Sequence, residues 1–135
     1  MGTQQILLIV LSVIIVGIAV AVGITMFNAQ SVNSNRNACI ADMNNFSSSA
    51  LAFYKTPVSH GGAGSDSLNV TIDKVGNYIG VGYVENDDQL NTGNGVYTIT
   101  LESPNIVKFT AAGTETGVTP VTTVSLSTSA IATTP

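Results

Sequence analysis

The sequence is short of charge. Charged residues make up 9% of its 135 residues, whereas an average soluble domain has roughly 25%. The first charged side chain is Arg36, which excludes an ordinary water-soluble globule built from the whole chain. The net charge is −4, and Arg36, Lys55, Lys74 and Lys108 are scattered. Nucleic-acid binding needs clustered Lys and Arg to neutralise phosphates, so we expect no nucleic-acid partner.

Cysteine and histidine occur once each. Cys39 has no partner for an intramolecular disulfide, and a lone cysteine on a helix is most often a small buried apolar residue. His60 lies in a Ser/Gly-rich loop, and the chain has no Gly-x-Ser-x-Gly motif. The acidic run 85–88 fits no EF-hand spacing and is interpreted as a solvated turn. We therefore expect no catalytic residue, no cofactor, no metal ion and no enzymatic activity.

One long apolar run stands at the N-terminus. Residues 6–27 are 22 residues without charge, and Ser12 and Thr25 are their only polar side chains. As a helix this run is about 33 Å long, enough to cross a bilayer core of ~30 Å. It lacks the positive n-region of a secretory signal and exceeds the usual h-region length, so we expect it to be retained. Gly17 and Gly23 lie inside it, where glycine permits close helix–helix approach or local unwinding.

The helix is predicted to continue beyond the apolar run. Residues 28–54 contain neither Pro nor Gly, and their apolar residues recur mostly three or four apart. Pro57 and the Ser/Gly-rich stretch 59–65 end the pattern. The sequence therefore predicts one helix over about residues 3–55, roughly 80 Å long, with an amphipathic second half.

The rest of the chain is predicted to form strands. Alternating apolar and polar residues, separated by turn residues, are typical of short antiparallel strands whose one face is buried. We expect that face to pack on the apolar stripe of the helix, and we expect the final residues to be loose. Loops are predicted at 85–88 and 91–95 and a turn at 103–105. The predicted strands are 68–73, 77–84, 95–101, 106–111 and 121–126.

The expected fold class is therefore α+β, with a long N-terminal helix packed on a small antiparallel β-sheet headpiece. Residues 1–27 form an apolar transmembrane or filament-core helix, and residues 28–55 its amphipathic continuation. Residues 56–135 form the headpiece with a Ser/Thr-rich tail.

In this architecture the chain resembles a type IV pilin. The similarity rests on Gln5-Ile6-Leu7-Leu8-Ile9-Val10 and on the glycine-interrupted apolar stretch to Phe27. The resemblance implies a structural subunit that is inserted in the membrane and then polymerises with copies of itself into an extracellular filament. It also implies partners: the inner-membrane pilus assembly machinery and a prepilin peptidase.

Three departures from the family pattern mark the chain as atypical. No charged leader precedes Met1, so either the sequence shows the mature form or its processing differs. Where the family carries a glutamate at the fifth mature position, counting from Met1 gives Gln5, which forms hydrogen bonds but cannot neutralise an ammonium group. Counting from Gly2 gives Ile6 instead. The family's C-terminal disulfide is absent, because Cys39 has no partner.

Subunit–subunit contacts are assigned to the start of the helix, with Gly17 and Gly23 as sites of local loosening or close approach and Gln4 and Gln5 as sources of amide contacts. The full set is Met1, Gln4, Gln5, Ile6, Leu7, Ile9, Val10, Ile14, Gly17 and Gly23. The alternatives are a single-pass membrane-anchored surface protein and a pseudopilin of a secretion system. Asn69 and Asn45 begin N-glycosylation sequons, and Asn69 is preferred because Asn45 falls in the predicted helix, facing the sheet.

Overall fold

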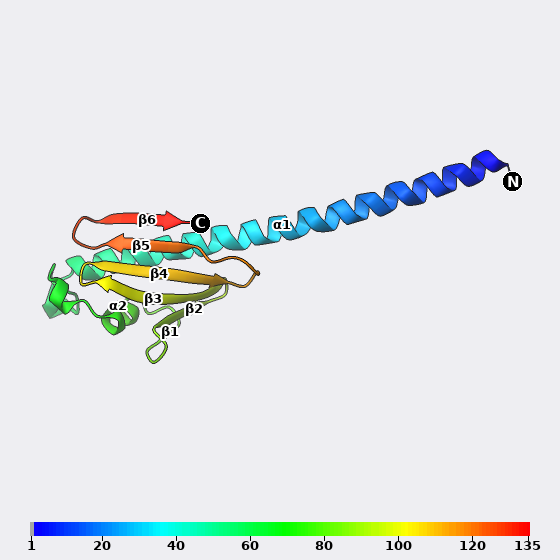
Figure 1. The fold of residues 1–135 in the computed structure, drawn as a ribbon. Coiled ribbons are helices and arrows are strands. Elements are labelled where there is room, and N and C mark those ends of the chain that lie inside the picture. Colours follow the sequence, from blue (N-terminus) through cyan, green and yellow to red (C-terminus); the bar gives the residue numbers. More distant parts are fainter. Residues whose placement is uncertain (1) are drawn as a thin grey trace.

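The structure, a computed structural model, describes residues 2–135. It consists of one long helix and a headpiece that packs against the C-terminal half of that helix (Figure 1). The first half of the helix projects away from the headpiece, and the N-terminus lies at its far end. The α+β fold predicted from the sequence is confirmed.

Helix α1 runs from Thr3 to Lys55 without interruption, as the sequence predicts. It passes through Gly17 and Gly23, so neither glycine unwinds the helix in the single chain. The helix ends where the N–H of Thr56 still donates to the carbonyl oxygen of Ala52 at 2.9 Å, one residue before a proline. Proline has no N–H and its ring disfavours a helical conformation in the residue before it, so the helix stops there.

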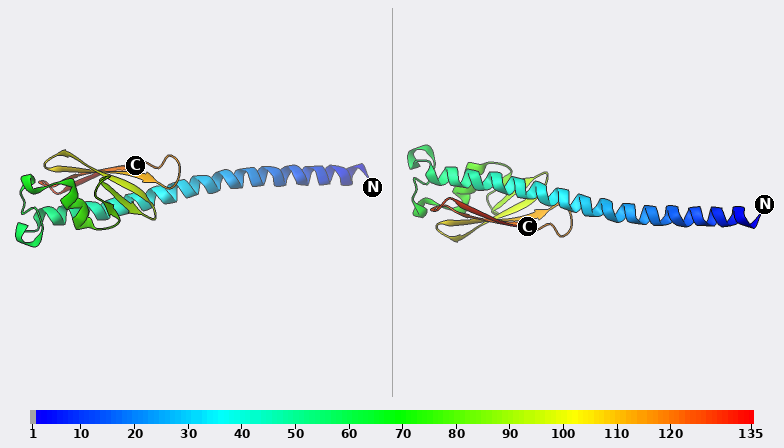
Figure 2. Two further views of the ribbon diagram at one scale, coloured as in Figure 1. Left: turned by 90° about the horizontal axis from the view of Figure 1, so that it is seen from below. Right: turned by 90° about the horizontal axis from the view of Figure 1, so that it is seen from above.

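The strands form one six-stranded antiparallel sheet in the order β1-β2-β3-β4-β5-β6, each strand paired with its neighbours in the chain. Such a meander needs only short connections. Views from two opposite directions place the sheet on one side of α1 (Figure 2). The strands are β1 Tyr83–Val84, β2 Gln89–Thr92, β3 Gly95–Ser103, β4 Ile106–Gly113, β5 Val121–Ser125 and β6 Ala130–Thr134.

The core lies between the inner face of the sheet and one stripe of α1. Phe46 is at its centre, with its ring 5.0 Å from that of Tyr97 in an edge-to-face arrangement and 6.1 Å from that of Phe109. The buried helix residues follow a spacing of three and four, which keeps them on one side of the helix. The apolar ones are Cys39, Met43, Phe46, Ala50 and Phe53, and Ser47 is the one buried polar residue of α1.

The segment after α1 differs from the prediction. Residues 68–73 do not form a strand: they hold a short 3-10 helix, η2 (Ser67–Asn69), after a first one, η1 (Val58–His60). Helix α2 then spans Ile72–Ile79, where a strand was predicted from residue 77. Thr71 caps α2 with its hydroxyl, and Gly80 ends it in a left-handed conformation with φ +72°. These two signals outweigh the alternation, because a capping hydroxyl and a glycine just past the end define a short helix.

Two strands of the sheet were not predicted. Strand β2 lies between the predicted loops 85–88 and 91–95 and runs into the second of them, and β6 lies in the final residues, which were expected to be loose. Strand β1 keeps only the last two residues of the predicted strand 77–84, whereas β3, β4 and β5 agree with the prediction to within a few residues. Strands β2 and β6 depend on pairing with a neighbouring strand, and this is not encoded in their own alternation.

Candidate functional site

The N-terminal half of α1, residues 3–30, is not covered by the headpiece, and we call it the bare half. Every residue from Gly2 to Gln30 is exposed, and the large hydrophobic side chains of this half are between 51% and 74% exposed. By length and composition the helix is able to cross a membrane. The side chains concerned are Ile6, Leu7, Leu8, Ile9, Val10, Leu11, Val13, Ile14, Ile15, Val16, Ile18, Val20, Val22, Ile24, Met26 and Phe27.

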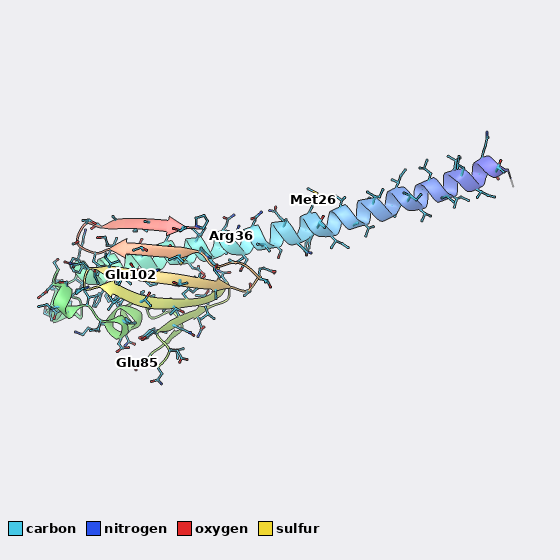
Figure 3. All side chains as sticks on the ribbon, viewed as in Figure 1. Met26, Arg36, Glu85 and Glu102 are labelled. Carbon is cyan, nitrogen blue, oxygen red and sulfur yellow. The ribbon has the colours of Figure 1, made fainter. Side chains whose placement is uncertain are left out.

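These side chains surround the helix and do not form a stripe. Figure 3 shows side chains projecting on all sides of the bare half, and the labelled Met26 is one of them. Arg36, the first charged residue, lies beyond the bare half, where α1 runs beside the sheet. The change from apolar to charged surface therefore coincides with the start of the headpiece.

Two of the polar side chains in the bare half are satisfied by their own helix. The hydroxyl of Ser12 donates to the carbonyl oxygen of Ile9 at 2.7 Å, and that of Thr25 donates to Val22 at 2.8 Å. Such bonds hide a hydroxyl from an apolar surrounding. The amides of Gln4 and Gln5 make no side-chain hydrogen bond within residues 2–135, so an apolar surrounding requires partners for them from outside the chain.

Small residues mark two sides of the bare half. Gly17 and Ala21 are four residues apart and share one side, and Ala19 and Gly23 share another. At about 100° per residue the two pairs lie roughly 160–200° apart around the helix. Apart from the backbone of α1 itself, no atom of the described chain lies within 4 Å of the position that a Cβ would occupy at Gly17 or Gly23. Neighbouring helices can thus approach closely from two opposite sides.

The remaining predicted contact residues are exposed and do not converge on one site. Gln4, Gln5, Ile6, Leu7, Ile9, Val10 and Ile14 are distributed around the first turns of α1. Met1 lies outside the described residues. These residues therefore form a continuous apolar surface and not a pocket.

The carboxylate of Asp42, on the C-terminal half of α1, connects this helix to the sheet. Oδ2 of Asp42 accepts hydrogen bonds from the hydroxyl of Tyr97 at 2.8 Å, from Nδ2 of Asn94 at 2.8 Å and from the hydroxyl of Thr92 at 3.2 Å. Burial raises the pKa of Tyr97, and its hydrogen bond to Asp42 raises this pKa further. The three partners come from β2, β3 and the turn between them, so no local sequence pattern around Asp42 predicts the contact.

A second polar contact fixes the junction with the bare half. Nδ2 of Asn35 donates to the carbonyl oxygen of Asn94 and to the hydroxyl of Thr114, both at 3.0 Å. Oδ1 of Asn35 accepts from the N–H of Glu115 at 3.3 Å, and the hydroxyl of Ser31 donates to that glutamate's carboxylate at 3.0 Å. These bonds hold the β2–β3 turn and the β4–β5 loop against the first polar turn of α1.

An open groove of about 390 Å³ lies at this junction. Its lining carries one ionisable side chain, Glu115, and so does not offer a set of metal ligands. It is formed by Phe27, Gln30, Ser31, Ser34, Asn35, Ala38, Asn94, Thr114 and Glu115.

The groups weighed for chemistry stay apart. His60 is exposed, and its Nδ1 lies 3.0 Å from the hydroxyl of Ser59, with no carboxylate bonded to it. Residues 2–135 contain no cluster of three His, Cys, Asp or Glu side chains able to hold a metal ion. Cys39 is fully buried, as expected for a small apolar residue.

The two sequons differ in accessibility. Asn45 is exposed on α1, so the expectation that it faces the sheet is wrong. The neighbouring residue, Phe46, occupies the buried stripe instead, because adjacent helix residues point about 100° apart. Asn69 is partly buried in η2, and its Nδ2 donates to the carbonyl oxygen of Ala63 at 3.2 Å.

Comparisons of the chain with known protein families, characterised proteins and solved structures find no significant match.

Proposed function

We propose that the chain is a structural subunit that polymerises through the bare half of α1 into an extracellular filament of the type IV pilus kind. The apolar helices of many copies form the core, and the headpieces form the outer surface. The single observation that carries this proposal is the bare half of α1: it is apolar on all sides, free of charged side chains, and left uncovered by its own headpiece.

Such a helix is stable only in lipid or among other helices of its kind. A filament core provides the second surrounding once the subunit leaves the membrane. The absence of charge fits this role, because an unpaired charge buried among helices costs several kcal/mol. Identical subunits joined by a contact that does not close form an open helical polymer.

The placement of small residues favours polymerisation over simple anchoring. The small pairs Gly17/Ala21 and Ala19/Gly23 lie on opposite sides of α1, which permits close contact with two neighbours at once. A membrane anchor does not need two such contact sides.

The partners of this subunit are other copies of itself and, before assembly, the membrane. In the core, the amides of Gln4 and Gln5 hydrogen-bond to neighbouring subunits, since they have no partner in their own helix. A pilus assembly machinery and a prepilin peptidase are the further partners that the resemblance implies.

The test is to shear cells that express the chain, image the released fraction by electron microscopy, and sequence the N-terminus of its main band. We expect fibres whose major protein is this chain. Ile14→Asp, which places a charge in the bare half, is expected to abolish fibres, whereas Asn44→Asp on the exposed headpiece part of α1 leaves them intact. Recovery of the wild-type chain only in detergent-solubilised membranes, without fibres, refutes the proposal and favours a membrane-anchored protein.

A further inference from the structure

The two edges of the sheet are protected very differently. Strand β1 is only Tyr83–Val84, and the residues that follow it include Glu85, Asp87 and Asp88. A short strand beside a run of acidic side chains is a poor template for another strand. Strand β6 has five residues, all exposed, and no charged side chain occurs anywhere from Thr116 to Pro135. This edge carries none of the usual protection.

The inner side of β6 is also uncovered. Ile131 is 41% exposed, although Val124, its cross-strand partner in β5, is fully buried under α1. Thr133 is exposed as well, opposite the buried Thr122. The helix therefore lies over β5 more fully than over β6, and both an apolar side chain and a row of backbone N–H and C=O groups remain open at β6.

We propose that the β6 edge pairs with the β6 edge of a second copy of this chain. Unpaired backbone groups of an edge strand are complementary to another strand, and no other segment within residues 2–135 pairs with this edge. Self-pairing brings no like charges together, because β6 has none. The opposite edge, β1, is too short and too close to acidic residues to be the partner.

Antiparallel pairing about a two-fold axis at Ala132 uses all five residues of each strand. Ala132 then lies opposite Ala132 of the second copy on the outer face, and Ile131 lies beside Thr133 of the second copy on the inner face. A contact of this kind uses the same patch on both subunits. It covers the exposed part of Ile131.

The direction of β6 relative to α1 decides whether the paired subunits belong to one filament or to two. The strand lies alongside α1 (Figure 1), so antiparallel strands place the two helices in opposite directions. Subunits of one filament share one direction, so the pairing joins neighbouring filaments of opposite polarity side by side. This setting rests on the proposed function; the strand pairing itself does not.

Cysteine cross-linking of the full chain tests the geometry. The natural Cys39 is fully buried, so we expect it to form no disulfide between subunits. Ala132→Cys is expected to give a disulfide-linked dimer on mild oxidation, in sheared filaments and in detergent at high protein concentration. Thr100→Cys, exposed on the outer face of β3, is the matched control and is expected to stay monomeric. Equal cross-linking of both variants, or of neither, overturns the proposal, and so does linkage of Ala132→Cys to a different protein.

Charge substitutions at Ala132 test whether the strand pairing joins filaments side by side. Ala132→Lys alone and Ala132→Glu alone place like charges opposite each other, and each is expected to abolish side-by-side filament bundles in electron micrographs. An equimolar mixture of the two is expected to restore them. Single filaments that bundle equally in all samples overturn the strand pairing and leave the proposed function intact. A specific Ala132→Cys dimer in a chain that never forms filaments upholds the pairing and refutes the proposed function.

Discussion

The carboxylate of Asp42 is the contact whose removal should most weaken the attachment of α1 to the sheet. Its Oδ2 accepts three hydrogen bonds, two of them 2.8 Å long, from groups 50 to 55 residues away in the chain. Hydrogen bonds to a charged group contribute about 1.5–3 kcal/mol each, and a buried hydroxyl left without its partner costs about 1–3 kcal/mol. Tyr97 is fully buried and donates one of the three.

We therefore expect Asp42→Ala to lower the free energy of unfolding of the headpiece by about 2–4 kcal/mol, since the three bonds share one acceptor and are not additive. Asp42→Asn keeps a neutral oxygen in the same place and is expected to lose about half as much. With an m-value of about 1–2 kcal/mol/M, Asp42→Ala lowers the urea midpoint by roughly 2 M.

The assay is urea unfolding of the full chain in non-ionic detergent, followed by near-UV circular dichroism of the tyrosines. Asp87→Ala, in the exposed β1–β2 loop, is the control and is expected to change stability by less than about 0.5 kcal/mol. A double-mutant cycle with Tyr97→Phe is expected to give a coupling of about 1–2 kcal/mol. If Asp42→Ala destabilises no more than Asp87→Ala, or if the coupling is zero, the carboxylate does not hold the sheet to the helix.

Two further predictions concern alkaline pH and helix packing. Folding raises the pKa of Tyr97, so the unfolded chain loses this proton near pH 10 while the folded chain keeps it; the contribution of Tyr97 to stability is unchanged below that pH and falls above it by about 1.4 kcal/mol per pH unit. Unfolding of the full chain between pH 9 and 12 measures this slope, and a Tyr97→Phe variant with the same slope as the wild type contradicts the assignment. Gly17→Leu is expected to reduce the yield of sheared filaments at least tenfold by blocking close helix approach, while the volume change Val20→Leu has little effect. Equal yields from the two variants rule out close packing at Gly17.

The sequence alone determined the features that depend on local composition. The limits of α1, Thr3 and Lys55, follow from an unbroken apolar and amphipathic pattern and from Pro57. The central strands β3 and β4 follow from alternation next to turn residues. The bare half of α1 was also predictable from the sequence, because an apolar run without charged residues is not stable as a water-exposed surface.

Only the tertiary structure decided what depends on residues distant in the chain. Asp42 looked like one more polar residue on a helix face, and its role exists only because β2 and β3 bring three donors to it. Helix α2 lies where a strand was predicted, and its Tyr78 packs against Phe53 of α1 with the ring centroids 5.5 Å apart. Strand β6 formed where loose residues were expected, because pairing with β5 satisfies its backbone on one side. Its other side remains open, since hydrogen bonding between strands is a property of the sheet and not of any one strand.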